Sequence, residues 1–179
     1  MGLASDDRDA YRADNLAASL GLTLVSGDPG TNLLNARRDP AAPALVLRGT
    51  HEDRPIELAW RDGADGARLS MACTSGEPPF EVLNRERTPA MTPVPLLEAE
   101  AQPFGDPPLD ATYALRGGSR GLGPRLVDAV RPSLRVDWIH LLWDGEHLSD
   151  VLHPYATFRP GQGEAVLETM AAVARTIDG

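Results

Sequence analysis

The sequence predicts an α+β fold, in which an antiparallel β-sheet made of a meander and a C-terminal hairpin carries helices packed on one face. Two observations support the sheet. Residues 44–74 alternate apolar and polar side chains in three short runs, and residues 135–152 form two apolar-rich runs around Asp144-Gly145. The helices are supported by residues 164–177, which repeat apolar side chains at helical spacing. A period of two is typical of a strand with one buried face, and a period near 3.6 of a helix packed on a surface.

The chain has 179 residues, the size of one domain. We therefore expect a single α+β domain over residues 1–179. The stretch 85–110 contains six prolines and is the place where two subdomains would join. It is either a linker or a long crossing segment with a short strand near Leu96-Leu97. We favour the crossing segment, because neither half of the chain alone has enough apolar residues for a core.

The N-terminal half predicts a helix followed by strands. Residues 6–20 form the helix, which Gly21 is well placed to end, and residues 22–25 form a short strand. The meander strands are expected at 45–50, 55–61 and 67–74, with turns at 51–54 and 62–66, and a fourth strand at 80–84. The side chains expected on the buried face of the meander are Ile56, Leu58, Trp60, Leu69, Met71 and Cys73.

The C-terminal half predicts a strand, a helix, the hairpin and a last helix. The strand covers residues 111–116. The helix begins at Gly123-Pro124, where the missing N–H of proline costs little, and ends at Pro132. The side chains expected to be buried by the two helices are Leu122, Leu126, Val130, Val166, Leu167, Met170, Val173, Ala174 and Ile177.

The hairpin has an expected register. An Asp-Gly pair between two strand-like runs favours a two-residue type I′ turn. With that loop, Leu142 faces His147 and His140 faces Ser149. Side chains alternate between the faces of a strand, so Trp138, His140 and His147 share one mixed face of the hairpin.

The charge and the cysteine count exclude several classes of function. The net charge is -9 and the pI is about 4.8. Nucleic acids and anionic membrane surfaces need a cationic protein surface, so we expect neither as a partner, whereas a basic protein fits. Cys73 is the single cysteine, so no intramolecular disulfide can form, and we expect a thiol packed in the core. The N-terminus is acidic and no apolar run is long enough to span a bilayer, so we expect a cytoplasmic protein without membrane insertion.

Residues 117–121 read Gly-Gly-Ser-Arg-Gly and fit the pattern Gly-x-Ser-x-Gly between a predicted strand and a predicted helix. In a serine hydrolase such a turn exposes the nucleophile and aims backbone amides at an oxyanion, and His153 would follow in the order Ser, Asp, His. The same amides, flanked by Arg120 and Arg125, could instead bind an anion. The strands before the turn predict an antiparallel sheet, not the parallel sheet of such hydrolases. We therefore favour a plain strand-to-helix turn and assign no catalytic residue.

The two hairpin histidines are the other candidates for chemistry. In the expected register His140 and His147 lie diagonally, about 7–8 Å apart, within reach of one zinc ion, with His153 or Asp150 as a third ligand. We favour two polar side chains on the wetter face and assign no metal and no cofactor. An exposed tryptophan beside them would mark a contact surface, so Trp138, His140 and His147 are the residues that we expect to bind a partner.

One part of the chain resembles a known family. Residues 104–115 read Phe-Gly-Asp-Pro-Pro-Leu-Asp-Ala-Thr-Tyr-Ala-Leu, and residues 126–132 read Leu-Val-Asp-Ala-Val-Arg-Pro before the hairpin. Over about residues 104–152 this resembles a bacterial domain family of uncharacterised function, although Leu109 stands where an aromatic residue is usual. The resemblance implies an α+β fold and brings no catalytic residues.

These observations favour a non-enzymatic soluble domain that binds another protein. Two alternatives stay open: a small serine hydrolase that uses Ser119, and an acidic immunity-type inhibitor of a basic protein. The identity of the partner, the biological process and the oligomeric state are not specified by the sequence.

Overall fold

The computed structural model describes residues 12–32, 45–60, 67–85, 97–135, 140–152 and 162–179. These residues form a nine-stranded antiparallel sheet with helices packed against it, which confirms the predicted α+β class. The strands are β1 (Thr23–Ser26), β2 (Leu45–His51), β3 (Arg54–Trp60), β4 (Ala67–Ala72), β5 (Phe80–Asn84), β6 (Ala101–Gln102), β7 (Tyr113–Gly117), β8 (His140–Trp143) and β9 (His147–Leu152). The helices are α2 (Ala13–Leu20), α4 (Pro107–Thr112), α5 (Leu122–Val130), the 3₁₀ helix η1 (Arg131–Arg135) and α6 (Gln162–Asp178). No helix in these ranges is long and apolar enough to cross a membrane.

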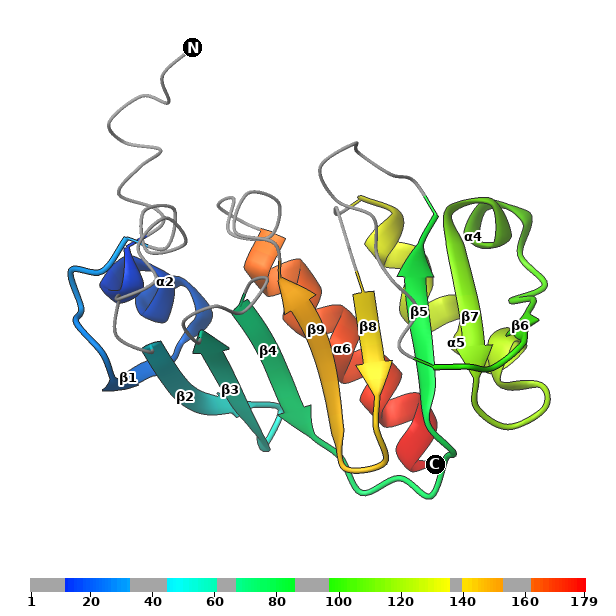
Figure 1. Cartoon of the computed structure of the whole chain (residues 1–179), viewed down its shortest axis with the longest axis horizontal. Coiled ribbons are helices and arrows are strands. Elements are labelled where there is room, and N and C mark those ends of the chain that lie inside the picture. The colour runs from blue at the N-terminus through cyan, green and yellow to red at the C-terminus, as the bar shows by residue number, and fades with distance from the viewer. Residues whose placement is uncertain (1–11, 33–44, 61–66, 86–96, 136–139, 153–161) are drawn as a thin grey trace, which may run out of the picture.

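The strands lie side by side in the order β1-β2-β3-β4-β9-β8-β5-β7-β6. The C-terminal hairpin β8–β9 therefore lies in the middle of the sheet, where β9 pairs with β4 and β8 pairs with β5 (Figure 1). The meander β2-β3-β4 has the predicted strands and the predicted turn at 51–54, with Leu47, Leu58 and Leu69 in one row across it. The turn expected at 62–66 lies outside the described residues. The hairpin thus joins the meander to the three strands beyond it.

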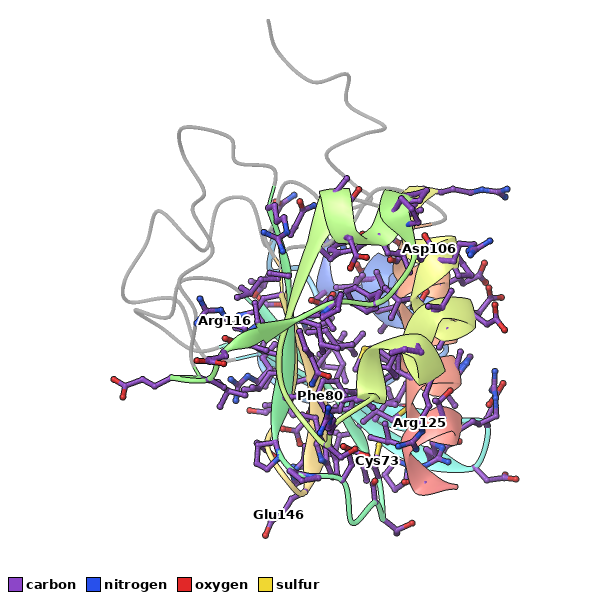
Figure 2. All side chains as sticks on the ribbon, turned by 90° about the vertical axis from the view of Figure 1, so that its right-hand side faces the viewer. Cys73, Phe80, Asp106, Arg116, Arg125 and Glu146 are labelled. Atoms are coloured by element: carbon purple, nitrogen blue, oxygen red, sulfur yellow. The ribbon has the colours of Figure 1, made fainter. Side chains whose placement is uncertain are left out.

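Helices cover one face of the sheet. Figure 2 shows the sheet nearly edge-on, with the helices on one side of it. All nine side chains predicted to be buried by the middle and last helices are buried. The first helix contributes Ala13, Leu16, Ala17 and Leu20 to the same core. Burial of one large aliphatic side chain stabilises a fold by about 1.5–3 kcal/mol, so these stripes supply much of the driving force for folding.

The opposite face of the sheet, which we call the back face, is exposed to solvent at the meander and buried in the middle of the sheet. In β2 the back-face side chains are partly or fully exposed, as predicted for a sheet with one buried face. In β8 all four residues are buried, and in β5 four of the five are buried. The back-face residues Glu81, Leu83, His140, Leu142 and Ser149 are therefore shielded from solvent. The expectation of one buried face thus holds for the meander and is wrong for the middle of the sheet.

The hairpin register differs from the expected one by two residues. Trp143 pairs with Leu148, and Leu142 pairs with Ser149. The side chain of Asp144 accepts hydrogen bonds from the backbone N–H groups of Glu146 (2.9 Å) and His147 (2.8 Å), which closes a four-residue loop. In the Asp-Gly pair of this loop, only the glycine has positive φ, so the turn is not type I′. A shift of two keeps every side chain on its predicted face.

The segment before β7 also differs from the prediction. Residues 107–112 form α4, where a loop and the start of a strand were expected. The side chain of Asp106 caps this helix by accepting a hydrogen bond from the N–H of Leu109, and prolines occupy its first positions. The short strand expected near Leu96-Leu97 is not formed at Leu97, and Leu96 lies outside the described residues; the strand in this region is β6.

Candidate functional site

The Gly-x-Ser-x-Gly turn has the strand-turn-helix setting that its sequence predicts. It connects the end of β7 to the start of α5. Gly117, Gly118 and Gly121 all have positive φ. A Cβ atom on Gly117 would lie 2.5 Å from the carbonyl oxygen of Pro79, so a side chain there would collide with the neighbouring backbone. Glycine is therefore favoured at these positions by the positive φ values and, at Gly117, by the neighbouring backbone.

A carboxylate from elsewhere in the chain fills this turn. Glu77 Oε1 accepts a hydrogen bond from the backbone N–H of Ser119 at 2.5 Å, and Glu77 Oε2 lies 3.1 Å from Nη1 of Arg125. The Glu77 side chain is only 6% exposed. The anion that the amides and arginine of this turn could bind is thus supplied by the protein itself.

The pKa of Glu77 reflects this environment. Burial alone would raise the pKa of the carboxyl group, but the hydrogen bonds from Ser119 and the charge of Arg125 outweigh it. Together they hold the pKa of Glu77 below its usual value of 4.5. At neutral pH the carboxylate is therefore ionised and bound in the turn.

This arrangement does not suit a serine nucleophile. The hydrogen bonds recorded for Ser119 join it to Glu77, Gln102 and Leu122, and within the described ranges none joins it to a histidine. A hydrolase needs a base on the serine and free amide donors for the oxyanion. Here the Glu77 carboxylate already accepts the hydrogen bond of the Ser119 amide. His153, the histidine expected in the hydrolase interpretation, lies outside the described residues.

A second pair of ionisable groups lies on the back face. Glu81 in β5 and His140 in β8 sit diagonally on adjacent strands, and His140 Nε2 is 3.0 Å from Glu81 Oε2. The other oxygen, Oε1, accepts a hydrogen bond from the N–H of Leu97 at 3.2 Å. The Glu81 and His140 side chains are 0% and 6% exposed. Both carboxylate oxygens are therefore hydrogen-bonded in a dry environment.

The histidine of this pair is kept neutral. Burial lowers the pKa of His140 below its usual 6.5, and the positive charge of Arg68 acts in the same direction. The Glu81 carboxylate opposes this shift but does not overcome it. A neutral imidazole protonated on Nε2 donates to Glu81, so the pair is a buried hydrogen bond that fixes β5 to β8.

The structure places the three residues predicted to bind a partner in different environments. His140 is buried against Glu81, His147 is exposed at the hairpin loop, and Trp138 lies outside the described residues. In the observed register His147 is four residues along the strand direction from His140, about 13 Å. The diagonal zinc pair is therefore wrong, because it depended on the two-residue loop. The described part of the chain also holds no group of three or more metal-ligating side chains.

Cys73 is half-buried, not fully buried as expected. It follows β4, and its thiol lies 3.7 Å from the carbonyl oxygen of Met71. Burial raises the pKa of the thiol, with the nearby Asp178 carboxylate acting in the same direction. The thiol is thus protonated at neutral pH, which fits a packing role.

Sequence reasoning did not single out Glu77 or Glu81. Glu77 lies in a Gly-Glu-Pro-Pro loop, where an acidic residue usually faces solvent. Glu81 stands between Phe80 and the apolar pair Val82-Leu83, so the sequence does contain a signal. A single charge inside such an apolar strand is typical of a strand that is buried on both faces and has a polar partner.

Matching against protein-family models gives no match, and neither does comparison with curated proteins. The resemblance of residues 104–152 to a bacterial family therefore remains a prediction. Among solved structures, the fold is similar to that of the mycobacterial trehalose monomycolate transport factor A, TtfA. The TM-score is 0.61 and the sequence identity 10%, and the similarity covers 93% of each chain. This likeness establishes a shared fold.

Proposed function

We propose that this chain is a non-enzymatic domain that acts by binding another protein. The main support is the state of its one catalytic motif. In the Gly-x-Ser-x-Gly turn the backbone N–H of Ser119 donates to Glu77, so this amide is not free for a substrate oxyanion, and among the described residues no hydrogen bond joins Ser119 to a histidine. The turn is thereby explained as part of the fold.

The charge of the chain indicates the kind of partner. A net charge of -9 attracts a basic protein and speeds its association. An immunity-type inhibitor of a basic protein would be one example of such a domain. TtfA, which shares the fold, is named as a transport factor and not for a catalysed reaction, and this also fits a binding role.

The proposal is tested with the full chain and its Ser119→Ala variant. Each is immobilised for affinity capture, and the retained protein is then purified and titrated by calorimetry. We expect both chains to bind the same protein with dissociation constants within about twofold, because Ser119 contributes to folding and not to recognition. Neither should hydrolyse p-nitrophenyl esters faster than buffer or react with a fluorophosphonate. Ser119-dependent hydrolysis, or the lack of any saturable protein complex, would contradict the proposal.

A further inference from the structure

The two edges of the sheet are built differently. In the described part of the chain, β1 has β2 as its one strand neighbour and β6 has β7, so these two strands end the sheet (Figure 1). An edge strand presents backbone N–H and C=O groups that another strand can pair with. Proteins guard such edges with short strands, charges, prolines and bulges that twist the edge away.

The β6 edge carries these guards. The strand has two residues, exposed Glu98 and Glu100 precede it, and Pro103 follows it. Arg116 of β7 donates a hydrogen bond to the carbonyl of Ala99, and Gln102 bonds to the carbonyls of the glycine turn. This end of the sheet is therefore closed to strand addition.

The four residues of β1 include no charge and no proline, and the first charge and proline after it are Asp28 and Pro29, beyond Gly27. The sequence of β1 is Thr-Leu-Val-Ser, and its burial pattern is mostly exposed. Val25 is 53% exposed, more than any other large apolar side chain among the described residues. The register with β2 shifts between Leu24 and Ser26, so Val25 is the extra residue of a bulge. A bulge at a sheet edge changes the direction of a side chain, and here it leaves the β-branched side chain of Val25 exposed to solvent.

The β1 edge is also connected to the helix and to the core. The N–H of Leu22 donates to the carbonyl of Ala17 at 2.8 Å, which ties the start of β1 to α2. Leu22 crosses so close to Gly49 of β2 that a Cβ atom there would lie 2.8 Å from its side chain. Leu24 packs against the core from the other side of the bulge. A preformed edge loses little conformational entropy when it binds, which favours affinity.

We infer that the β1 edge is an interaction surface that accepts an extended segment of a partner protein as an added strand. This inference rests on the proposed function, since it names the surface by which the partner is bound. The segment alternates β-branched residues, which pack beside Val25, with basic residues, which the net charge of -9 attracts. A second copy of this chain fits less well, because two chains of that charge repel each other.

The test uses two capped peptides of equal strand propensity and opposite charge, acetyl-(Lys-Val)4-amide and acetyl-(Glu-Val)4-amide. Each is titrated into the ¹⁵N-labelled full chain while amide shifts and hydrogen exchange are followed. The lysine peptide should shift and protect the amides of residues 23–26 and bind at least about tenfold more tightly than the glutamate peptide. Shifts centred on β6, or equal binding of both peptides, would overturn the inference.

Matched variants separate charge from folding. Val25→Lys should weaken binding of the lysine peptide at least about fivefold through like-charge repulsion, and Val25→Glu should keep it. Ala101→Lys places the same charge on exposed β6 as a control and should leave binding unchanged. A Val25→Lys chain that binds like wild type would overturn the inference. Protection of residues 23–26 that rises with protein concentration without peptide would do so too, in favour of self-association.

The captured protein distinguishes this inference from the proposed function. A partner retained equally by wild type and Val25→Lys means that protein binding stands and the β1 edge does not mediate it. A wild-type chain that retains no partner means that the proposed function fails, whatever the peptides do.

Discussion

Glu77 is the residue on which the glycine turn depends. It supplies both oxygens that hold Ser119 and Arg125 in place. We predict that Glu77→Gln lowers the free energy of unfolding by about 2 kcal/mol, since hydrogen bonds to a buried charge are worth more than neutral ones. Glu98→Gln, the same change at an exposed carboxylate, is the control and should have little effect. Equal urea midpoints for the two variants would contradict the assignment.

The pH dependence of that loss has a defined sign. The pKa of Glu77 is lower in the folded chain than its usual 4.5, so the unfolded chain takes up the proton first as the pH falls. The stabilisation by Glu77 is therefore present above about pH 4.5 and is lost below it. The difference between wild type and Glu77→Gln should shrink in that range.

His140 gives a second pH prediction, in a higher range. Its folded pKa is below its usual 6.5, so the unfolded chain binds the proton first when the pH falls below that value. Wild type should lose stability between pH 7 and 5, with a contribution from this group of at most about 1.4 kcal/mol per pH unit. His140→Gln keeps an N–H donor for Glu81 and should flatten this slope in urea titrations. An unchanged slope would show that His140 does not control it.

The same substitution, aspartate to glycine, should have opposite effects on stability in the two acidic hairpin turns. In the β2–β3 turn Glu52 and Asp53 have φ values of 49° and 61°, in the left-handed region. Glycine adopts this region without strain, so Asp53→Gly should raise the free energy of unfolding by about 0.5–1 kcal/mol. Asp144→Gly should lower it by about 1 kcal/mol, because Asp144 accepts two backbone hydrogen bonds. Thermal midpoints that move in the same direction for both would contradict this reading of the turns.

At the scale of elements, the periodicity of apolar residues predicted the strands and helices whose form depends on local sequence alone. The meander and the apolar side of α6 follow from alternation and helical spacing, because each buries one face. The predicted length of the β8–β9 loop was wrong because the Asp144 side chain accepts hydrogen bonds that close a longer loop. An Asp-Gly pair fits such a loop as well as a type I′ turn, so the residue types alone do not decide between them. Helix α4 was missed although Asp106 and two prolines are start signals, because six residues are too few to show a period.

The whole sheet depends on the hairpin in its middle. Strand β9 pairs with β4 and β8 pairs with β5, so separating the halves at residues 85–110 would remove the strand neighbour on each side of the hairpin. We therefore propose that residues 1–179 unfold as one unit. Tryptophan fluorescence, to which buried Trp143 contributes, and far-UV circular dichroism should give one coincident urea transition. Two separate midpoints would instead indicate two subdomains.

The sequence predicted the class of the fold but not the candidate sites. Charge and composition limit the partners, and alternation places His140 on the mixed face of the hairpin, yet its pairing with Glu81 comes from β5 lying beside β8. That neighbour relation joins segments about 60 residues apart in sequence, which no local pattern specifies. The filling of the glycine turn by Glu77 is equally long-range.

The central claim is that this chain binds a protein through β1 and uses Ser119 for folding. The most direct measurement is the dissociation constant of the captured partner for wild type, Ser119→Ala and Val25→Lys, side by side. We predict equal values for the first two and at least about tenfold weaker binding for the third. Loss of binding or activity in Ser119→Ala with an unaffected Val25→Lys would contradict the account.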